Sequence, residues 1–490
     1  MRISWIWGLC FFLFAGSLHA QEVVARLDIG RKDPKPNFVE YSPVDRGLVT
    51  MGPASRSSSR YFAIAKYSED FKLEWKKNVF EQNGRKNVDF LTVIGPNILI
   101  FVSEFFPRQK IIKTYYSHFD LAGNVIAEDQ ILSIYPNQKE QKVELQYVLS
   151  PDKKALLAYK NLQNRKEAEN ILYYLFNDRG EVELNGEFQL KYPDNRLRIT
   201  SLRVSNQGNI YALAKYYGQS WVVDDDNFQY MVFRKDVTTE LETEFKIEVG
   251  RRFISDLAFK VDREENIYVA GFYSNRSNDQ IAGTVLQKIA PDGRLIQDST
   301  DPFQKNFLGY YLSQGQINRG RELRDFFVRE KDGIILRSDG GVLLIAEKFY
   351  ITNDPYRNQF GNYQDQTIYH FDDVILTSIS PSGDIEWQAI VDKAQTSEDP
   401  STLSYFNAVS PSGTYIFYET RPRRMGFNIY YSRIDIQGNV SGPMPLLPVY
   451  SGNNQFFPRL AIQTGNREAL MLYVQGRGRT YSVLKLRFDD

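Results

Sequence analysis

Cysteine is nearly absent from this chain of 490 residues, and histidine is rare, with one cysteine and three histidines. The single cysteine, Cys10, lies in the first twenty residues, so a chain that loses this segment has none. Such a chain cannot form a disulfide, a thiolate zinc site or a cysteine nucleophile. The histidines that remain, His118 and His370, are far apart in the sequence, which argues against a metal site built from several histidines.

The chain also lacks an excess of charge of either sign, since 60 basic residues balance 60 acidic residues. A field of the whole molecule that attracts nucleic acid is therefore not expected, and we predict no nucleic-acid partner. We predict no metal or organic cofactor either, apart from the weak calcium candidate described below.

One apolar run stands out, from Trp5 to Ala15 in "MRISWIWGLCFFLFAGSLHA". It follows a basic residue, it precedes a short polar stretch that ends in Ala20, and it is short for a bilayer span. We interpret residues 1–20 as a secretory signal peptide, with an uncleaved membrane anchor as the alternative. The mature chain, 21–490, then has no transmembrane segment and is expected to be secreted or periplasmic in a bacterial cell envelope.

Aromatic residues are abundant, at 14% of the chain, and a glycine turn recurs between apolar strands. The turn occurs in "HFDLAGNVIA", "LFNDRGEVEL", "KIAPDGRLIQ", "SISPSGDIEW" and "RIDIQGNVSG". The aligned glycines are Gly123, Gly180, Gly293, Gly383 and Gly438, separated by 57, 113, 90 and 55 residues. A repeat of about 56 residues explains these separations if one repeat carries an insertion. Tight turns favour glycine because one residue needs positive φ.

A second hairpin precedes each of these turns, as in "ISDLAFKVDREENIYVAGFYS" (254–274). Four short strands in each 50–60 residues describe a blade of a β-propeller. We count eight such units. Their first strands are expected to begin near Phe38, Val88, Val143, Ile199, Ile254, Gly333, Thr402 and Arg459.

The last unit offers three strands before the chain stops, and "EVVARLDIG" (22–30) is an unassigned strand at the start. Pairing the two would complete the last blade and remove an exposed sheet edge. We therefore predict an all-β fold, one β-propeller domain with eight four-stranded blades, closed by the N-terminal strand. Seven blades and a series of β-sandwiches are the alternatives.

The repeats also resemble those of known propellers. "GNIYALAKYY" and "ENIYVAGFYS" are similar to bacterial propeller repeats in which this strand precedes a Lys-Leu-x-x-x-Gly turn. "LSPDKKALLAYK" and "VSPSGTYIFYE" resemble the Ser-Pro-Asp-Gly hairpins of TolB-like propellers. The resemblance implies a propeller fold and a binding or scaffolding role in the bacterial envelope, and it carries over no functional residue.

In a propeller, the loops from second to third strands and from each fourth strand to the next blade lie on one face, which we call the connection face. The two largest irregular segments, 301–332 and 351–366, belong to blade six and are expected to rise from this face, the first of them partly helical. Functional variation concentrates in such loops. From these segments we select the candidate ligand-binding residues Tyr310, Tyr311, Arg321, Tyr356, Phe360 and Tyr363. The alternative is that these aromatic side chains pack the loops onto the body.

Blade four contributes Trp221 to the same face, as a ligand platform or a packing residue, and blade seven contributes Arg423 and Arg424. Guanidinium groups suit carboxylate or phosphate ligands, although a mixed, solvated rim also explains them. The run Asp224, Asp225 and Asp226 offers oxygen ligands of the kind that Ca²⁺ prefers. Its spacing lacks the alternating pattern of calcium loops, so a solvated acidic loop is the alternative.

No catalytic signature is present: the chain has no Gly-x-Ser-x-Gly motif, and no pair of carboxylates can be chosen from sequence. We therefore predict a non-enzymatic protein that binds a protein or a glycan, anionic ones included, through the connection face. A glycoside hydrolase or lyase with carboxylates in a central pocket is one alternative. A structural subunit of an envelope assembly is the other.

Overall fold

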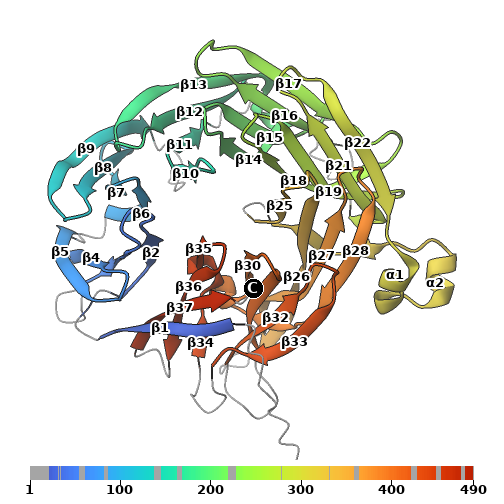
Figure 1. Cartoon of the computed structure of the whole chain (residues 1–490). Helices are drawn as coiled ribbons and strands as arrows, with labels where there is room; N and C mark the ends of the chain where they lie inside the picture. The colour runs from blue at the N-terminus through green and yellow to red at the C-terminus, as the bar shows by residue number, and fades with distance from the viewer. Residues whose placement is uncertain are drawn as a thin grey trace, which may run out of the picture.

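The computed structural model describes residues 21–30, 33, 35–54, 61–81, 86–136, 145–162, 168–218, 228–277, 279–329, 332–357, 363–420, 428–447, 454–475 and 480–488. The proposed signal peptide lies outside these residues. The described chain is all-β, with antiparallel sheets that follow one another around a common centre (Figure 1). This radial arrangement of four-stranded sheets is typical of a β-propeller.

The first four sheets each contain four strands in chain order. Sheet one contains β2 (Phe38–Tyr41), β3 (Leu48–Pro53), β4 (Tyr61–Tyr67) and β5 (Leu73–Glu81). Sheet two contains β6 (Lys86–Ile94), β7 (Asn97–Phe106), β8 (Ile111–Asp120) and β9 (Val125–Pro136). Sheet three contains β10 (Gln146–Leu149), β11 (Leu156–Asn161), β12 (Ala168–Phe176) and β13 (Val182–Pro193). The 3-10 turn η1 (Asp194–Arg196) leads to sheet four, with β14 (Leu197–Val204), β15 (Ile210–Tyr216), β16 (Gln229–Lys235) and β17 (Glu242–Ile247).

The next three sheets keep this order with additions. Sheet five contains β18 (Phe253–Val261), β19 (Ile267–Ser274), β21 (Gly283–Ile289) and β22 (Leu295–Pro302). Sheet six contains β24 (Phe326–Val328) and β25 (Ile334–Leu336), both paired with β26 (Val342–Arg357), then β27 (Tyr363–Ile379), which pairs with β28 (Ile385–Val391) and β29 (Gln395–Ser397). The turn η2 (Pro400–Thr402) precedes sheet seven, with β30 (Tyr405–Ser410), β31 (Gly413–Thr420), β32 (Asn428–Ile434) and β33 (Val440–Pro445).

Sheet eight joins the two ends of the chain. It contains β34 (Asn454–Phe456) and, after η4 (Pro458–Leu460), β35 (Ile462–Gly465), both paired with β36 (Glu468–Gln475), then β37 (Thr480–Phe488) and β1 (Gln21–Ile29). β1 pairs antiparallel with β37 from Gln21 opposite Phe488 to Ile29 opposite Tyr481 (Figure 1). This is the strand pairing that the sequence predicts. The first strands of the eight sheets also begin within three residues of their expected positions, with β25 and β35 taken for sheets six and eight.

The hydrophobic core is divided into clusters, each lying between two neighbouring sheets. Phe62 and Ile100 belong to the cluster between sheets one and two, for example, and Leu344 and Phe272 to the one between sheets five and six. Sheet eight packs on sheet one in the same way, through a cluster that we call the seam cluster: Ile29, Val39, Leu48, Ala65, Tyr67, Leu470, Leu472 and Val483. The second and third strands are buried on both sides because a sheet covers each side, which explains their nearly continuous apolar sequences.

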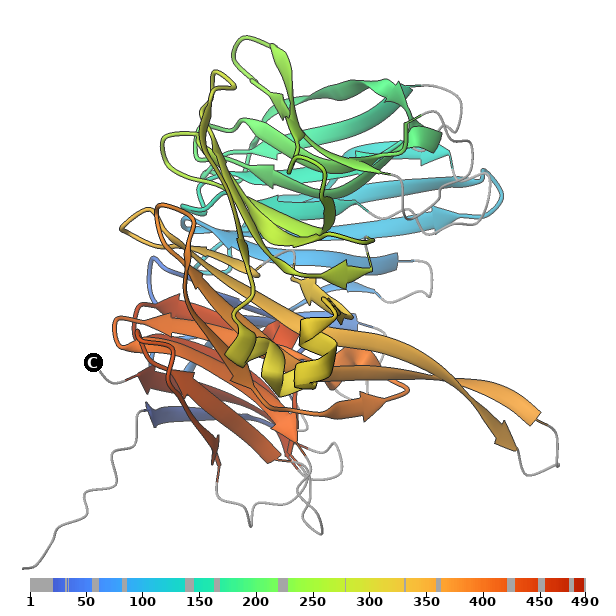
Figure 2. The ribbon, with the colours of Figure 1, turned by 90° about the vertical axis from the view of Figure 1, so that its right-hand side faces the viewer.

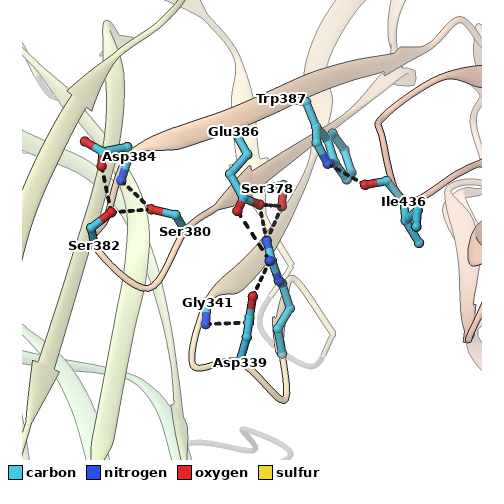
Figure 3. Close-up of polar contacts among 10 residues, drawn as sticks. Asp339, Gly341, Ser378, Ser380, Ser382, Asp384, Glu386, Trp387 and Ile436 are labelled. Atoms are coloured by element: carbon cyan, nitrogen blue, oxygen red, sulfur yellow. Dashed lines mark hydrogen bonds and ion pairs between the residues drawn. The ribbon is translucent and has the colours of Figure 1, made fainter.

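The recurring glycine turns bring neighbouring sheets into contact. Gly123 and Gly438 have φ of +84° and +86°, and a β-carbon on them would lie 2.9 Å and 2.6 Å from atoms of Trp75 and Trp387 of the preceding sheet. The indole nitrogen of Trp75 donates to the carbonyl of Leu121 at 2.9 Å. That of Trp387 donates to the carbonyl of Ile436 at 3.1 Å, as Figure 3 shows. The repeat therefore needs glycine for both turn conformation and close approach.

The turn of sheet six is held by its own polar side chains (Figure 3). Ser382 bridges Ser380 (2.7 Å) and Asp384 (2.7 Å), and the Arg337 guanidinium pairs with Glu386 and Asp339. These contacts lie within the turn and its neighbouring strands, so this face of sheet six is ordered by local chemistry.

We expect Ile29→Ala to lower the free energy of unfolding by about 2–4 kcal/mol, because Ile29 is 3% exposed and belongs to the seam cluster. Urea unfolding followed by tryptophan fluorescence measures the change. Val23→Ala is the matched control on the same strand, since Val23 is 37% exposed and should have a much smaller effect. Equal effects of the two substitutions would contradict the role given to β1.

Candidate functional site: the projecting hairpin of sheet six

The hairpin of β26 and β27 extends well beyond the body of the molecule (Figure 2). The strands have 16 and 17 residues and stay in register out to Arg357 opposite Tyr363. Their inner halves are buried between sheets five and seven, and their outer halves are exposed or half-buried. We expected residues 351–366 to form an irregular loop, and this is wrong: all except 358–362, which lie outside the described residues, continue the two strands.

A bulge marks the point where the hairpin leaves the body. Glu347 pairs with Val374 and Phe349 pairs with Phe371, so Asp372 and Asp373 of β27 together oppose one residue of β26. Such a bulge bends a strand pair and re-aims its side chains. The bulge therefore sets the direction in which the outer half of the hairpin projects.

A buried ion pair anchors the hairpin at this bulge. The Lys393 ammonium lies 2.6 Å from Glu347 Oε1, and the two side chains are 0% and 5% exposed. Lys393 also donates to the carbonyl of Phe371 (2.9 Å), and the Ser404 hydroxyl donates to Glu347 (2.5 Å). Burial lowers the pKa of Lys393. A buried charge is tolerated only when it is paired and hydrogen-bonded, as it is here.

The same network continues into sheets seven and eight. Gln395 accepts hydrogen bonds from Lys393 (3.0 Å) and from the backbone N–H of Ser404 (2.8 Å), and it donates to the carbonyl of Glu419 (2.8 Å). The Glu419 side chain accepts from the backbone N–H of Phe456 at 2.8 Å. Burial raises the pKa of Glu419 to about 7. A single polar chain therefore joins the base of the hairpin to the last sheet.

One side of the hairpin carries an apolar strip, the hairpin aromatic face: Phe327, Phe349, Ile351, Tyr369 and Phe371. The ring centroids of Phe349 and Phe371 are 4.8 Å apart, and those of Phe327 and Phe349 are 6.3 Å apart. Phe327 is 49% exposed and Ile351 is 50% exposed. Because Phe349 follows Glu347 by two residues on β26, this face lies on the side of sheet seven.

The opposite side of the hairpin is more polar. Tyr350 stacks on His370 with centroids 4.4 Å apart and planes at 6°, and His370 Nε2 lies 2.9 Å from the Thr352 hydroxyl. His370 thus sits within a strand and has neighbours of its own. His118, the other histidine beyond residue 20, is buried with Nε2 2.7 Å from Asn97 Oδ1. Its pKa is lowered by burial, which is consistent with a structural role.

The segment 301–332 contains two short helices, α1 (Lys305–Tyr311) and α2 (Gln314–Asn318), as the expectation of partial helix suggested. It also contains β23 (Leu323–Arg324), which pairs with β20 (Gln280–Ile281), and β24, so the insertion is shorter than we expected. Phe307 is 5% exposed in the core between sheets five and six.

The candidate residues in this segment have different surroundings. Tyr310 is 54% exposed, and its ring centroid is 4.9 Å from that of Tyr311. Tyr311 packs on Phe326 (5.4 Å) and lies beside Asp373, and burial together with this carboxylate raises its pKa. Arg321 is exposed. The structure therefore brings Tyr310 and Tyr311 to the base of the hairpin, with Tyr311 largely in a packing role.

Several candidates lie outside what the structure describes. At the outer end of β26 and β27, Tyr356 pairs with Gln364 and Tyr363 pairs with Arg357. Nothing is described of the side chains of these two tyrosines. Seven candidates, including the three calcium candidates, lie outside the described residues altogether: Trp221, Asp224, Asp225, Asp226, Phe360, Arg423 and Arg424. The calcium hypothesis and the ligand roles of these residues remain predictions.

Two features of other parts of the molecule concern metal binding and catalysis. Within the described ranges, no group of three or more His, Cys, Asp or Glu side chains is placed to hold a metal ion. Glu169 lies beside Asp194, and burial together with the neighbouring carboxyl raises its pKa well above the ordinary value. A catalytic acid can have such a pKa. The Glu169 side chain is 0% exposed, however, so no substrate reaches it in this conformation.

Comparison with known proteins identifies no family. No family model matches the chain, and no curated protein matches it. Three solved structures align with this chain at 10% identity. The alignment with the polysaccharide lyase Uly1 covers 82% of this chain and 90% of that one, with a TM-score of 0.39. A puromycin hydrolase S511A mutant complexed with PGG aligns over 91% of this chain and 59% of its own (TM-score 0.38), and the β-propeller domain of the Trilobed protease from Pyrococcus furiosus over 83% and 96% (TM-score 0.34). These TM-scores are below 0.5, so no argument is drawn from the likenesses.

Sequence reasoning missed the anchor of this site. Lys393, Gln395 and Ser404 follow sheet six in a stretch, "VDKAQTSEDPSTLSY", that is polar like a surface loop. A lysine in such a stretch does not by itself predict a buried cation, because lysines are almost always exposed. The buried partner, Glu347, ends an apolar run ("GGVLLIAE"), and a carboxylate in this position is the stronger indication of a buried charge that needs a cation.

We expect Lys393→Met to lower the free energy of unfolding by about 3–5 kcal/mol, because it leaves Glu347 buried without its cation. The double variant Glu347→Gln/Lys393→Met should recover much of this loss in urea unfolding. Lys191→Met, which breaks an exposed pair with Glu244, is the control and should change the midpoint little. A double variant as unstable as the single one would argue against the ion pair as the cause.

Glu419 predicts a dependence of stability on pH. The raised pKa means that the folded protein keeps the proton of Glu419 between about pH 4.5 and pH 7, so its stabilising contribution is full below pH 4.5 and is lost as the pH rises through 7. Glu419→Gln stays neutral, and its stability relative to the natural protein should rise by about 2–3 kcal/mol from pH 4.5 to pH 8. Urea unfolding at both pH values tests this.

The exposed Glu398→Gln is the matched control for the pH experiment, because it removes a carboxylate from the surface near the same network. If Glu419→Gln and the natural protein keep the same difference in stability at both pH values, the assignment to Glu419 is wrong.

Proposed function

We propose that this chain is a non-enzymatic binding protein of the bacterial cell envelope, secreted or periplasmic, that recognises a protein or a glycan through its connection face. The observation that carries the proposal is the hairpin aromatic face, an exposed apolar strip on a hairpin that projects from the body (Figure 2). Soluble proteins rarely expose such contiguous apolar surface without a partner for it.

We also infer that the eight sheets are the blades of one closed propeller. The support is the seam cluster, which packs sheet eight on sheet one as the other clusters pack neighbouring sheets, together with the pairing of β1 with β37. A closed ring gives the hairpin a rigid base, since sheet six is then held from both sides.

The composition of the face suits both classes of partner. Phenylalanine and tyrosine rings supply large contact area at low cost in side-chain entropy, and they stack on sugar rings or fill pockets of a protein. Tyr310, half exposed near the base of the hairpin, adds a ring with a polar end. The anionic partners that we considered from sequence would use arginines of the loops, among them Arg321, which is exposed, and Arg423 and Arg424, which lie outside the described residues. The described hairpin aromatic face itself is apolar and does not favour an anion.

The proposed location follows from the signal peptide alone. No helix in the described portion of the chain is long and apolar enough to cross a membrane. An enzyme of the glycoside hydrolase or lyase class would need two carboxylates open to substrate, and Glu169 of the Glu169–Asp194 pair is fully buried. The role of structural subunit in an envelope assembly would use the rims of the blades, and the exposed strip on the projecting hairpin favours the binding role instead.

The test is binding by the double variant Phe327→Ser/Ile351→Ser, which removes the two most exposed apolar side chains of the face. We expect at least a tenfold loss of binding in a glycan array and in pull-downs from envelope extract, because each lost side chain removes apolar area from a contact. The thermal midpoint should stay close to that of the natural protein, since both side chains are half exposed.

Ile126→Ser/Ile131→Ser is the matched control, with two exposed apolar side chains on β9, away from the hairpin (Figure 1). Binding by this control should equal that of the natural protein. If the hairpin variant binds as well as the control, the hairpin aromatic face is not the recognition surface.

A further inference from the structure

A pocket lies where sheet one meets sheet eight, on the face opposite the connection face. We call it the seam pocket. Its volume is about 390 Å³, which falls within the range of small-molecule sites. It lies between the turn from β2 to β3 and the turn from β35 to β36, and it is lined by Tyr41, Arg46, Thr464, Gly465, Asn466, Arg467, Glu468 and Arg487.

Positive charge dominates the lining, with three arginines and one carboxylate. Arg46 of sheet one reaches Glu468 of sheet eight (2.9 Å) and also contacts Glu69 (2.9 Å). Arg487 lies 3.6 Å from Glu468, and Lys485 lies 3.3 Å from Glu69. Glu468 is thus shared by several cations, and their charge is only partly neutralised.

Two residues that line the pocket, Thr464 and Gly465, have unusual surroundings. The Thr464 hydroxyl is buried and has no hydrogen-bond partner, although such groups are nearly always paired. Its neighbour Gly465 has no atom within 4 Å of the position that a β-carbon would take. The open space at Gly465 leaves room for a ligand between the two turns.

Arg46 is held toward the pocket at a conformational cost. Its φ is +57°, in the left-handed region that non-glycine residues avoid. The turn is fixed by the hydrogen bond from Ser42 N–H to the Gly47 carbonyl (2.9 Å) and by the ion pair of Asp45 with the fully buried Lys66 (2.6 Å). Strained residues of this kind persist where the surroundings determine them and cluster at functional sites.

We propose that the seam pocket binds a small ligand through an oxyanion, a carboxylate or a phosphate group, held by Arg46 from sheet one and by Arg467 and Arg487 from sheet eight. Guanidinium groups match both anions through paired hydrogen bonds. The ligand contacts the first and last sheets at once, so it stabilises the seam of the fold. This site is on the other face from the hairpin, and its existence is independent of the function proposed above.

Thermal unfolding and calorimetric titration test the site, with inorganic phosphate and glucuronate as the two probes and sodium chloride at equal ionic strength as the reference. We expect a saturable rise of the midpoint with at least one probe and none with chloride, because a ligand that binds only the folded state stabilises it. Saturation at lower phosphate than glucuronate identifies a phosphate ligand, and the reverse identifies a carboxylate. No saturable rise with either probe overturns the proposal.

Arg467→Gln and Arg487→Gln should each weaken binding of the effective probe by tenfold or more. Arg294→Gln is the control: Arg294 is an exposed arginine in the glycine turn of sheet five, and its side chain is 76% exposed. Equal effects of all three substitutions would mean that the probe responds to net charge, and the proposal would then fail.

Glu468→Gln separates binding from stability. It removes the carboxylate that neutralises the arginines, so the ligand-free midpoint should fall while affinity for the anion rises several-fold. A merely structural cluster would show the fall in midpoint with no rise in affinity, and that result would refute the site.

Discussion

The seam between the first and last sheets is the contact on which the rest of the structure depends. β1 pairs with β37, and Ile29, Leu48, Leu472 and Val483 close the apolar contact between sheets that are more than four hundred residues apart in the chain. Without cysteine beyond residue 10, no disulfide can hold these ends together. Burial and backbone hydrogen bonds must do so, and each apolar side chain in the seam therefore counts for the stability of the whole fold.

A rigid body allows one element to project. The hairpin of β26 and β27 leaves the molecule at a bulge, and the buried pair Lys393–Glu347 fixes its base. The network through Gln395 and Glu419 ties that base to sheets seven and eight, so the direction of the hairpin is set by several sheets together. The hairpin aromatic face therefore lies on an ordered element. A flexible loop would lose conformational entropy when it became ordered on a partner, and this loss would reduce the affinity.

The two faces of the molecule differ in their chemistry. The hairpin side offers aromatic and aliphatic side chains, suited to a large partner, whereas the seam pocket offers guanidinium groups around a single carboxylate, suited to a small anion. A ligand in the seam pocket would stabilise the contact between the first and last sheets, far from the hairpin. The two proposed binding surfaces can therefore be varied separately, and a change at one would affect the other only through the stability of the shared body.

The sequence by itself determined the repeat: it has glycine turns at a period of about 56 residues, alternating strands, an unassigned strand at the start and a last unit that is one strand short. These features imply radial four-stranded sheets, because turn geometry and strand alternation are local properties. It also placed Tyr310 and Tyr311 near the unusual part of sheet six. Only the tertiary structure decided that 351–357 and 363–366 are strand, that Lys393 is buried, and that Arg46 lines the same pocket as Arg467 and Arg487. Glu347 lies tens of residues from Lys393, and Arg46 lies hundreds of residues from Arg467 and Arg487. Local sequence carries no record of which distant side chain will neutralise a charge.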